Sequence, residues 1–391
     1  MQRRQLIQFG ALGTLASPWL HAQAAATPGV SKTELTVGSI QDLSGPLVSF
    51  GKPCRDGMVM RVDETNAKGG VHGRKINLVV EDSAYDTKKA VLAADKLVSS
   101  DHVFAVVGTL GATPALSTMQ SIMENNALHL FPVTASRAMY EPFNRLKFAA
   151  FTPYSISTRI GLKEALKRGY KRVAILYQDD EFGLDVVAGA EAALKDAGLT
   201  LVERTTYKRG ATDFSSQMAK LKAANAELIV LATIVRETIG AMSEARKIGY
   251  TGDFFGSQAS YIPATPKIGG KAVDGLLNVV EIPVPYRDDP GNSKPLNDWM
   301  DAYKARFNTE ADLGGIFGWV LMDMFIKTAE KAGADLTTDS FVKALESSTF
   351  PATFLGTPEF SFSASKRLGN SQCRLAQIRN GRWVNVSDFV K

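Results

Sequence analysis

Short apolar segments and amphipathic helical patterns alternate along this chain, and this alternation restricts the possible folds more than any other feature. In the first half of the chain, nearly continuous apolar runs lie at residues 35–40, 76–82, 103–108 and 128–133. The patterns between them have helical periodicity and lie at residues 51–70, 87–100 and 114–126. Continuous apolar strands joined by amphipathic helices are typical of a parallel sheet covered by helices on both faces.

The same alternation begins again near residue 150. Further strand patterns lie at residues 172–178, 227–233 and 253–257. Further helical patterns lie at residues 155–169, 184–198, 213–225 and 236–249. Since one set of alternating elements is enough for one α/β unit, the repetition predicts a second unit.

The chain after residue 274 departs from this alternation. Residues 275–292 contain three prolines and a polar end, which predicts a crossing segment or linker. Two long helical patterns follow at 293–307 and 314–333, and Asn380-Gly381 is a strong hairpin signal between two final strand patterns. The predicted fold is therefore α/β, with two doubly wound parallel-sheet lobes.

The N-terminus has the pattern of an export signal. A pair of arginines precedes an apolar run at residues 6–20, and residues 22–24 form an A-x-A cleavage site. The apolar run is short for a membrane span and Pro18 interrupts it, which favours cleavage over anchoring. We therefore expect residues 1–24 to be a signal peptide that is cleaved near Ala24, after export by the Sec or the twin-arginine route. The mature protein is expected in the periplasm.

Composition and cysteine content exclude some classes of protein and leave one question open. The formal net charge is +5, but basic residues are spread beside acidic ones, which indicates solvated helix faces and no nucleic-acid-binding surface. The two cysteines, Cys54 and Cys373, either form a disulfide in an exported protein or stay as separate thiols. No Cys or His spacing is typical of a zinc site.

The motifs of common enzyme classes are missing from the sequence. It contains no G-x-x-x-x-G-K-[ST], no G-x-G-x-x-G after the first strand and no G-x-S-x-G. The acidic group Asp179, Asp180 and Glu181 has no partners at metal-ligand spacing, so it indicates a solvated loop that opens a helix. We therefore expect no catalytic residue, no metal and no cofactor.

The stretch VVGTLGATPALS predicts an anion-binding turn. A buried strand pattern ends at Gly108, a short Gly/Thr/Ala turn follows, and Pro114 lies at the start of a helical pattern. The free N–H groups and the positive end of the dipole at a helix N-terminus attract anions. Without catalytic motifs nearby, this turn is predicted to hold an anion and not to transform it.

Several segments, taken in order and spacing, resemble the leucine/isoleucine/valine-binding class of periplasmic solute-binding proteins. In the first lobe they are Ser44-Gly45-Pro46, Asn66-x-x-Gly69-Gly70, Gly73-Arg74, DSAYDTKKA, VVGTLGATPALS and LFPVTAS. In the second lobe they are RVAILYQDDEFGLD, TDFSSQMAKLKAANAELIVLA and EARKIGYTGDFFGS. The resemblance covers nearly all of the mature chain.

The resemblance implies a type I periplasmic-binding fold, in which three crossings form a hinge between the lobes. Lobe 1 is expected at 33–150 plus 284–357, and lobe 2 at 151–283 plus 358–391. Such a protein closes on a small molecule between its lobes. It delivers that molecule to an ABC permease of the inner membrane, acts as a monomer and is no enzyme.

The ligand site is expected in the crevice at the carboxyl ends of the strands. By resemblance, one anion-holding turn and a second ligand loop come from lobe 1. Phe50 and Phe182 lie where the family has aromatic walls, and each is either such a wall, which we favour, or a core residue. Tyr154 and Tyr261 are either part of the site or surface residues. The expected binding residues are Phe50, Gly111, Ala112, Thr113, Val133, Thr134, Ser136, Tyr154, Phe182, Ile234, Gln258 and Tyr261.

Two departures from the amino-acid binders concern the ligand's amino group. The amino-acid binders have an acidic residue that pairs with the ligand ammonium, and this sequence has Gln258 at that position. They also have an aromatic residue in a loop of lobe 2, where this sequence has the aliphatic Ile234. An ammonium without a carboxylate is costly to bury. The ligand is therefore expected to be an amino acid paired with another carboxylate, such as Asp179, Asp180 or Glu181, or an aromatic or aliphatic acid or amide.

Two further classes of function remain open at this point. An exported sensor that passes its ligand-bound state to a receptor would use the same fold. An exported α/β enzyme would need a nucleophile and base, or a metal, in the crevice. The solute-binding component of an ABC importer agrees with more of the sequence than either alternative.

Overall fold

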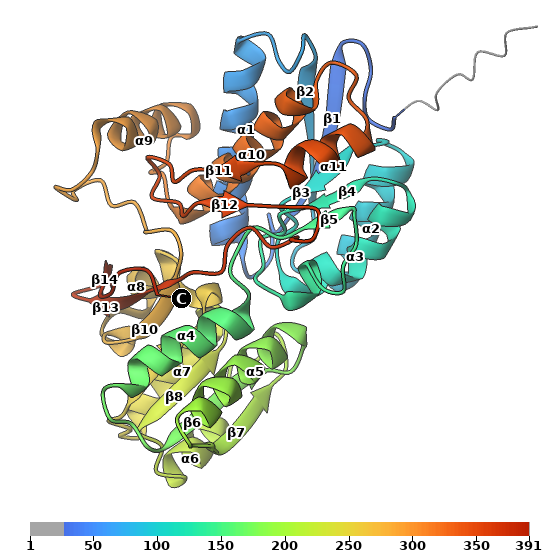
Figure 1. Cartoon of the computed structure of the whole chain (residues 1–391). Helices are drawn as coiled ribbons and strands as arrows, with labels where there is room; N and C mark the ends of the chain where they lie inside the picture. Colours follow the sequence, from blue (N-terminus) through green and yellow to red (C-terminus); the bar gives the residue numbers. More distant parts are fainter. Residues whose placement is uncertain (1–26, 391) are drawn as a thin grey trace, which may run out of the picture.

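The computed structural model describes residues 27–390 and shows an α/β protein of two lobes (Figure 1). The expected signal peptide at residues 1–24 lies outside the described residues. One lobe is built around a five-stranded sheet and the other around a seven-stranded sheet. Within the described part of the chain, no helix is long and apolar enough to cross a membrane.

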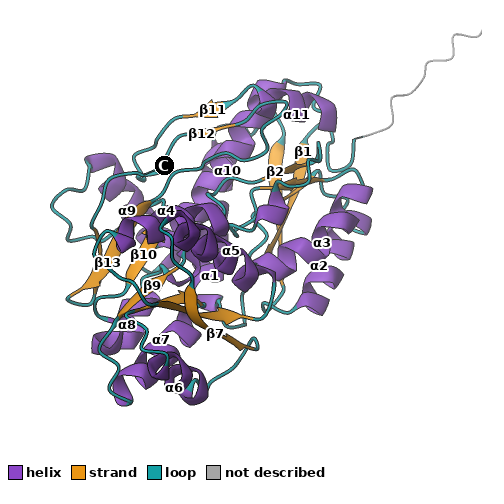
Figure 2. Cartoon of the chain, turned by 60° about the horizontal axis from the view of Figure 1, so that its bottom comes forward, coloured by secondary structure: helices purple, strands orange, loops and turns teal. Residues whose placement is uncertain are grey.

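The sheet of lobe 1 is parallel and has the order β2-β1-β3-β4-β5. Its strands are β1 (Glu34–Gln41), β2 (Lys75–Asp82), β3 (Ala105–Val107), β4 (Leu128–Leu130) and β5 (Lys147–Phe148). The helices of this lobe are α1 (Val48–Ala67), α2 (Thr87–Ser99), α3 (Ala112–Glu124), η1 (Arg137–Met139), α9 (Lys294–Phe307), α10 (Leu313–Ala332) and α11 (Thr338–Glu346). Figure 2 shows helices on both faces of this sheet. Alternate residues of β1 point to opposite faces, so Val37 packs toward α1 and α10 while Ile40 packs toward α2 and α3.

The sheet of lobe 2 has the order β14-β13-β10-β9-β8-β6-β7. Its strands are β6 (Val173–Gln178), β7 (Leu201–Tyr207), β8 (Leu228–Ala232), β9 (Asp253–Gly256), β10 (Leu277–Val280), β13 (Arg374–Arg379) and β14 (Arg382–Asn385). Its helices are α4 (Tyr154–Leu166), α5 (Glu181–Asp196), α6 (Ser215–Ala223), α7 (Val235–Lys247), η2 (Gln258–Ser260), α8 (Ala264–Gly269) and η3 (Gly270–Val273). The strands up to β10 are parallel, and the hairpin β13–β14 turns at Asn380-Gly381, both with positive φ, as expected.

Two strands of lobe 2 differ from the sequence interpretation. β7 was not predicted because it is an edge strand with alternating polar residues and lacks the apolar run of a buried strand. β10 lies inside the segment 275–292, which was predicted as a linker. The segment first adds a buried strand beside β9, and only the residues after Val280 form the crossing.

Three segments connect the lobes. The first lies between β5 and α4, the second follows β10, and the third lies at residues 370–373 before β13. The third crossing comes later than the expected boundary at 357/358, because the short strands β11 (Thr349–Phe350) and β12 (Phe360–Ser361) pair with each other on lobe 1. Phe362 packs against Phe131 and Phe148 there, with ring centroids 5.7 and 5.6 Å apart.

The two cysteines lie in different lobes and are both buried free thiols. Cys54 lies on α1 in the core of lobe 1. Cys373 is the last residue of the third crossing, directly before β13, with its Sγ atom 3.8 Å from the carbonyl oxygen of Ser157 on α4. Of the two alternatives left open by the sequence, the structure therefore has separate thiols and no disulfide. Burial raises the pKa of both thiols, to about 12 for Cys373, so neither is a reactive thiolate.

Helices α1 and α10 approach each other closely through glycines. A Cβ atom added at Gly318 of α10 would lie 1.8 Å from the carbonyl oxygen of Cys54 on α1. One added at Gly57 of α1 would lie 2.0 Å from the carbonyl oxygen of Gly315. Both contacts are with backbone atoms, so a side chain at either position would force the helices apart.

We predict that Gly318→Ala destabilises the protein by about 3 kcal/mol, the upper range for overpacking a core. The clash outweighs the gain of about 1 kcal/mol in helix propensity. Gly291→Ala is the control, because a Cβ atom there has its nearest neighbour at 3.3 Å in an exposed loop. Urea unfolding measures the free energy of unfolding of both variants. Equal stability of the two variants would contradict the backbone contact.

Candidate functional site

A cavity of about 100 Å³ lies between the lobes, where the strand ends of both sheets meet the first and second crossings. Both lobes and these two crossings contribute to its wall. It is lined by Leu47, Phe50, Tyr85, Leu110, Gly111, Ala112, Val133, Thr134, Ala135, Phe151, Tyr154, Phe182, Ile234, Gln258, Ala259, Tyr261, Ile262, Val280, Glu281, Ile282, Leu313 and Phe317. This volume is of the order of that of a cavity that holds one benzene-sized molecule.

Most of the residues expected from the sequence line this cavity. Those from lobe 1 are Phe50, Gly111, Ala112, Val133 and Thr134, and those from lobe 2 are Tyr154, Phe182, Ile234, Gln258 and Tyr261. They converge because the carboxyl ends of parallel strands lie at one edge of each sheet, and the two edges face each other. The cavity therefore lies where the strand order predicted a crevice.

Thr113 and Ser136 are the two expected residues that do not line the cavity. The Thr113 hydroxyl lies 2.7 Å from an Arg209 Nη atom and 3.2 Å from an Asp180 carboxylate oxygen, outside the cavity wall. The Ser136 hydroxyl caps η1 by accepting a hydrogen bond from the N–H of Ala138. Both hydroxyls serve neighbouring protein groups, which sequence spacing alone does not reveal.

Lobe 1 offers polar groups to the cavity at the N-terminus of α3. Gly111 is the N-cap of this helix and Ala112 is its first residue, so the first N–H groups have no partner within the helix. Thr134 lies in the neighbouring loop. Its hydroxyl is buried and has no hydrogen-bond partner among the described residues. These groups lie at the turn for which the sequence predicted anion binding.

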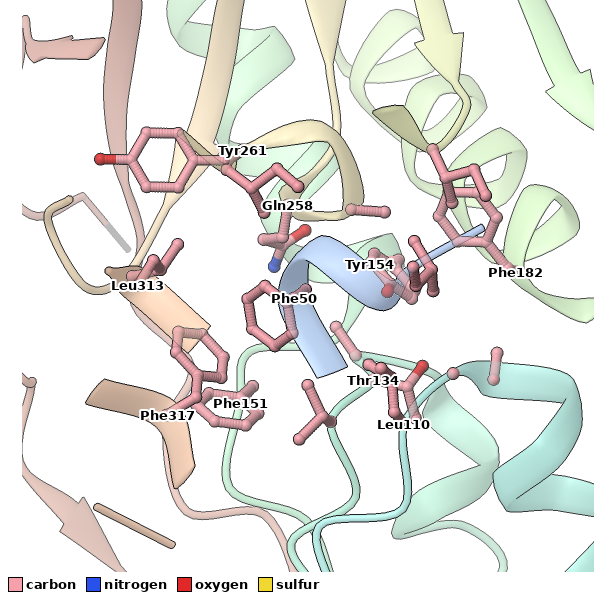
Figure 3. A pocket seen from close by; sticks show the side chains of 18 of the residues that line it. Phe50, Leu110, Thr134, Phe151, Tyr154, Phe182, Gln258, Tyr261, Leu313 and Phe317 are labelled. Atoms are coloured by element: carbon pink, nitrogen blue, oxygen red, sulfur yellow. The ribbon is translucent and has the colours of Figure 1, made fainter. Parts of the chain in front are cut away.

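Aromatic rings make up much of the remaining wall. Figure 3 shows Phe50 in the middle of the view, with Tyr154 and Phe182 on one side and Phe151 and Phe317 on the other. The rings of Phe151 and Phe317 stack with centroids 4.5 Å apart, and Tyr154 meets Phe182 edge to face at 4.9 Å. Burial raises the pKa of Tyr154 to about 12, so its phenol stays protonated at neutral pH.

Sequence reasoning missed the wall that the crossings and α10 provide. Phe151 and Ile282 lie on two of the crossings, and Leu313 and Phe317 lie on the first turns of α10. In the sequence, these four residues are apolar positions of the kind that a hydrophobic core also contains. Their place in the cavity follows from the packing of α10 against α1, beside Phe50.

Two polar side chains of the cavity wall are held by the crossings. The Gln258 amide donates to the carbonyl oxygen of Thr152 at 2.9 Å and accepts from the Ser157 hydroxyl at 2.9 Å. Glu281 accepts a hydrogen bond from the N–H of Thr152 at 3.0 Å and another from the Asn370 amide at 2.8 Å. Burial raises the pKa of Glu281 to about 7, although these donors act in the opposite direction.

Arg209 joins the two lobes at one side of the cavity. Its guanidinium extends from the loop after β7, pairs with Asp180 of lobe 2 at 2.9 Å and donates to the carbonyl oxygen of Tyr85 at 3.0 Å. It also lies 4.4 Å from the centroid of the Tyr85 ring. A second link is the hydrogen bond from the N–H of Arg137 to Asp185, at 2.8 Å. These contacts hold the lobes together beside the cavity.

We predict that Arg209→Ala shifts the solute-free protein toward an open arrangement by about fivefold. The partly exposed guanidinium contributes on the order of 1 kcal/mol across the cleft once screening is allowed for. Lys208→Ala is the matched control, since the one ion pair of Lys208 among the described residues is with Asp179 of its own lobe. Small-angle scattering should give a larger radius of gyration for the Arg209 variant alone. An unchanged radius in both variants would show that the link does not hold the lobes.

Comparisons with known proteins agree with this architecture. A family described as "Periplasmic binding protein" matches residues 34–382. A relative from Brucella abortus, named Leu/Ile/Val-binding protein homolog 7, is 27% identical over 300 residues and covers 73% of each chain. A solved fatty acid ABC transporter substrate-binding protein from Thermomonospora curvata has a TM-score of 0.83 at 20% identity, covering 93% of this chain and 94% of its own.

A solved solute-binding protein from R. palustris, in complex with benzoate, has a TM-score of 0.78 at 18% identity and covers 90% of this chain and 95% of its own. At these identities the solved structures establish the fold alone. The family match, which covers most of the chain, establishes membership. This chain belongs to the periplasmic binding protein family, in its leucine/isoleucine/valine-binding class.

Proposed function

We propose that this protein captures a small apolar carboxylic acid between its lobes and delivers it to an ABC importer. Residues 1–24 direct export, and the mature protein acts in the periplasm as a monomer that binds its solute without transforming it. The inner-membrane permease is its partner. The similar proteins have names that include both Leu/Ile/Val binding and fatty acid, so the choice of solute rests on the cavity itself.

The observation that carries this proposal is the composition of the cavity wall. Aromatic and aliphatic side chains dominate it, and Glu281 is the one Asp, Glu, Lys, Arg or His among the described lining residues. An apolar body gains free energy on entering such a wall, at roughly 25 cal/mol per Å² of area removed from water. A sugar or a polyvalent ion would find too few partners there.

A free α-amino acid fits this wall less well. Gln258 replaces the acidic partner of an ammonium, and none of the three acids after β6 takes over that role. Asp180 caps α5 and pairs with Arg209, Asp179 pairs with Lys208, and Glu181 is exposed. None of the three lines the cavity. An ammonium would therefore lose its hydration for little return.

The carboxylate of the solute has an anchor of neutral donors. The N–H groups at the start of α3 and the unpartnered Thr134 hydroxyl lie on the same side of the cavity. Hydrogen bonds to an anion are about twice as strong as those between neutral groups, so such donors can hold a carboxylate without a salt bridge. The aromatic rings then enclose the apolar body.

We predict that monocarboxylic acids with an apolar body raise the melting temperature of the mature protein. A solute at several hundred times its Kd adds about 3–4 kcal/mol of stability, which corresponds to several degrees. A thermal-shift panel of benzoate, octanoate, benzamide and leucine measures this effect. Stabilisation by leucine, with none by the two acids, would contradict the proposed class of solute.

We also predict that Gln258→Glu weakens binding of such an acid by at least tenfold, or about 1.4 kcal/mol. The new carboxylate would lie on the cavity wall and repel the solute anion at low dielectric. Gln217→Glu on α6 makes the same change in charge in lobe 2 away from the cavity, and should bind like the parent. Isothermal calorimetry compares the three proteins. Tighter binding by the Gln258 variant would indicate an ammonium in the solute.

A further inference from the structure

Glu281 connects all three crossings of the hinge. It lies at the start of the second crossing, and its carboxylate accepts from the Thr152 N–H of the first and from the Asn370 amide of the third. Thr152 and Asn370 are also joined directly, at 3.0 Å between the Asn370 amide and the Thr152 hydroxyl. The Thr152 hydroxyl in turn donates to the carbonyl oxygen of Gln372 at 2.8 Å. One carboxylate thus meets donors from both other crossings while it borders the cavity.

The groups around this carboxylate do not neutralise its charge. Arg374 on β13 is the neighbouring cation, but its guanidinium donates to the main-chain oxygens of Glu281 and Gly356, at 3.3 and 3.4 Å. It also lies 4.4 Å from the Phe389 ring centroid. The thiol of Cys373 is uncharged near neutral pH because its pKa is raised to about 12. Within the described residues, no ion pair involves the Glu281 carboxylate.

We infer that Glu281 determines which solutes the cleft accepts, because it takes up a proton when the lobes close on an apolar anion. This inference rests on the proposed function. An anionic solute and an ionised Glu281 would share one small apolar cavity, and two like charges at low dielectric repel each other strongly. Proton uptake removes the repulsion and leaves the hydrogen bonds of the crossings in place.

The same carboxylate keeps acceptor sites for a ligand ammonium. One oxygen accepts from Thr152 and the other from Asn370, and each carboxylate oxygen has a second lone-pair site. A ligand ammonium would therefore favour the ionised Glu281 and release its proton on binding, whereas an apolar anion would favour the protonated form. The direction of proton exchange distinguishes the two classes of solute.

The direction of the pH effect follows from linkage. The pKa of Glu281 is raised by burial to about 7, so the enclosed form holds more protons than a solvated form does between about pH 4.5 and 7. An enclosed anion raises the pKa further, so binding takes up part of a proton above pH 7. Affinity for a monocarboxylate should therefore rise as pH falls from 8 to 6, by at most tenfold per pH unit. The solute acids stay ionised throughout this range.

The first arm of the test needs no solute. An NMR titration follows the amide proton of Thr152, which donates to Glu281, over a pH range that extends from below 4.5 to above 7 and so includes both alternative midpoints. We expect a midpoint near 7 in the parent and no such transition in Glu281→Gln. Glu359→Gln, the same change at an exposed position of lobe 1, should keep it. A midpoint near 4.5 in the parent would overturn the inference. A transition near pH 7 that persists in Glu281→Gln would also overturn it.

The second arm measures proton exchange on binding. Calorimetry at pH 8 in buffers of different ionisation enthalpy gives the protons taken up with benzoate, octanoate or leucine. We expect proton uptake when either acid binds to the parent protein. Glu281→Gln should lose both this proton uptake and the pH dependence of Kd. Leucine binding with proton release would overturn both this inference and the proposed solute class. Binding of an acid with no proton exchange would overturn this inference and leave the proposed solute class in place. If none of the three probes binds, the titration of the Thr152 amide decides whether Glu281 titrates near pH 7.

Discussion

The site depends on the hydrogen bonds that join the three crossings. Each lobe is built around a separate sheet, and the crossings join the two lobes together with contacts that include those of Thr113, Arg209 and Asp185. Through Thr152, Glu281 and Asn370, the crossings become one unit instead of three independent linkers. That unit lies beside the cavity, and Glu281 belongs to both.

The cavity wall then limits the chemistry of the solute. Rings from both lobes and from the crossings exclude water, so every unpaired charge inside the cavity is costly. Neutral donors at the start of α3 can hold one negative charge, and the one carboxylate among the described lining residues, Glu281, accepts from two of the crossings. The selectivity we propose is therefore a consequence of desolvation more than of any single contact.

The sequence predicted the parts of this arrangement that depend on local patterns. Gly111 and Thr134 follow strand patterns directly, so strand order alone brings them to the crevice. Phe317 and Phe151 were missed because apolar residues on a helix or a crossing look the same whether they face a core or a cavity. Glu281 was missed for a related reason: it precedes prolines in a segment predicted as a linker, and its partners are more than 85 residues away in sequence.

The most direct test of the account is a crystal structure of the mature protein with octanoate or benzoate. The account predicts one acid molecule between the lobes, with its carboxylate at the N–H groups of the first turn of α3 and the Thr134 hydroxyl. Its apolar body would lie against Phe50 and the rings around it. An acid bound outside this cavity, or one whose carboxylate points away from α3, would contradict the account.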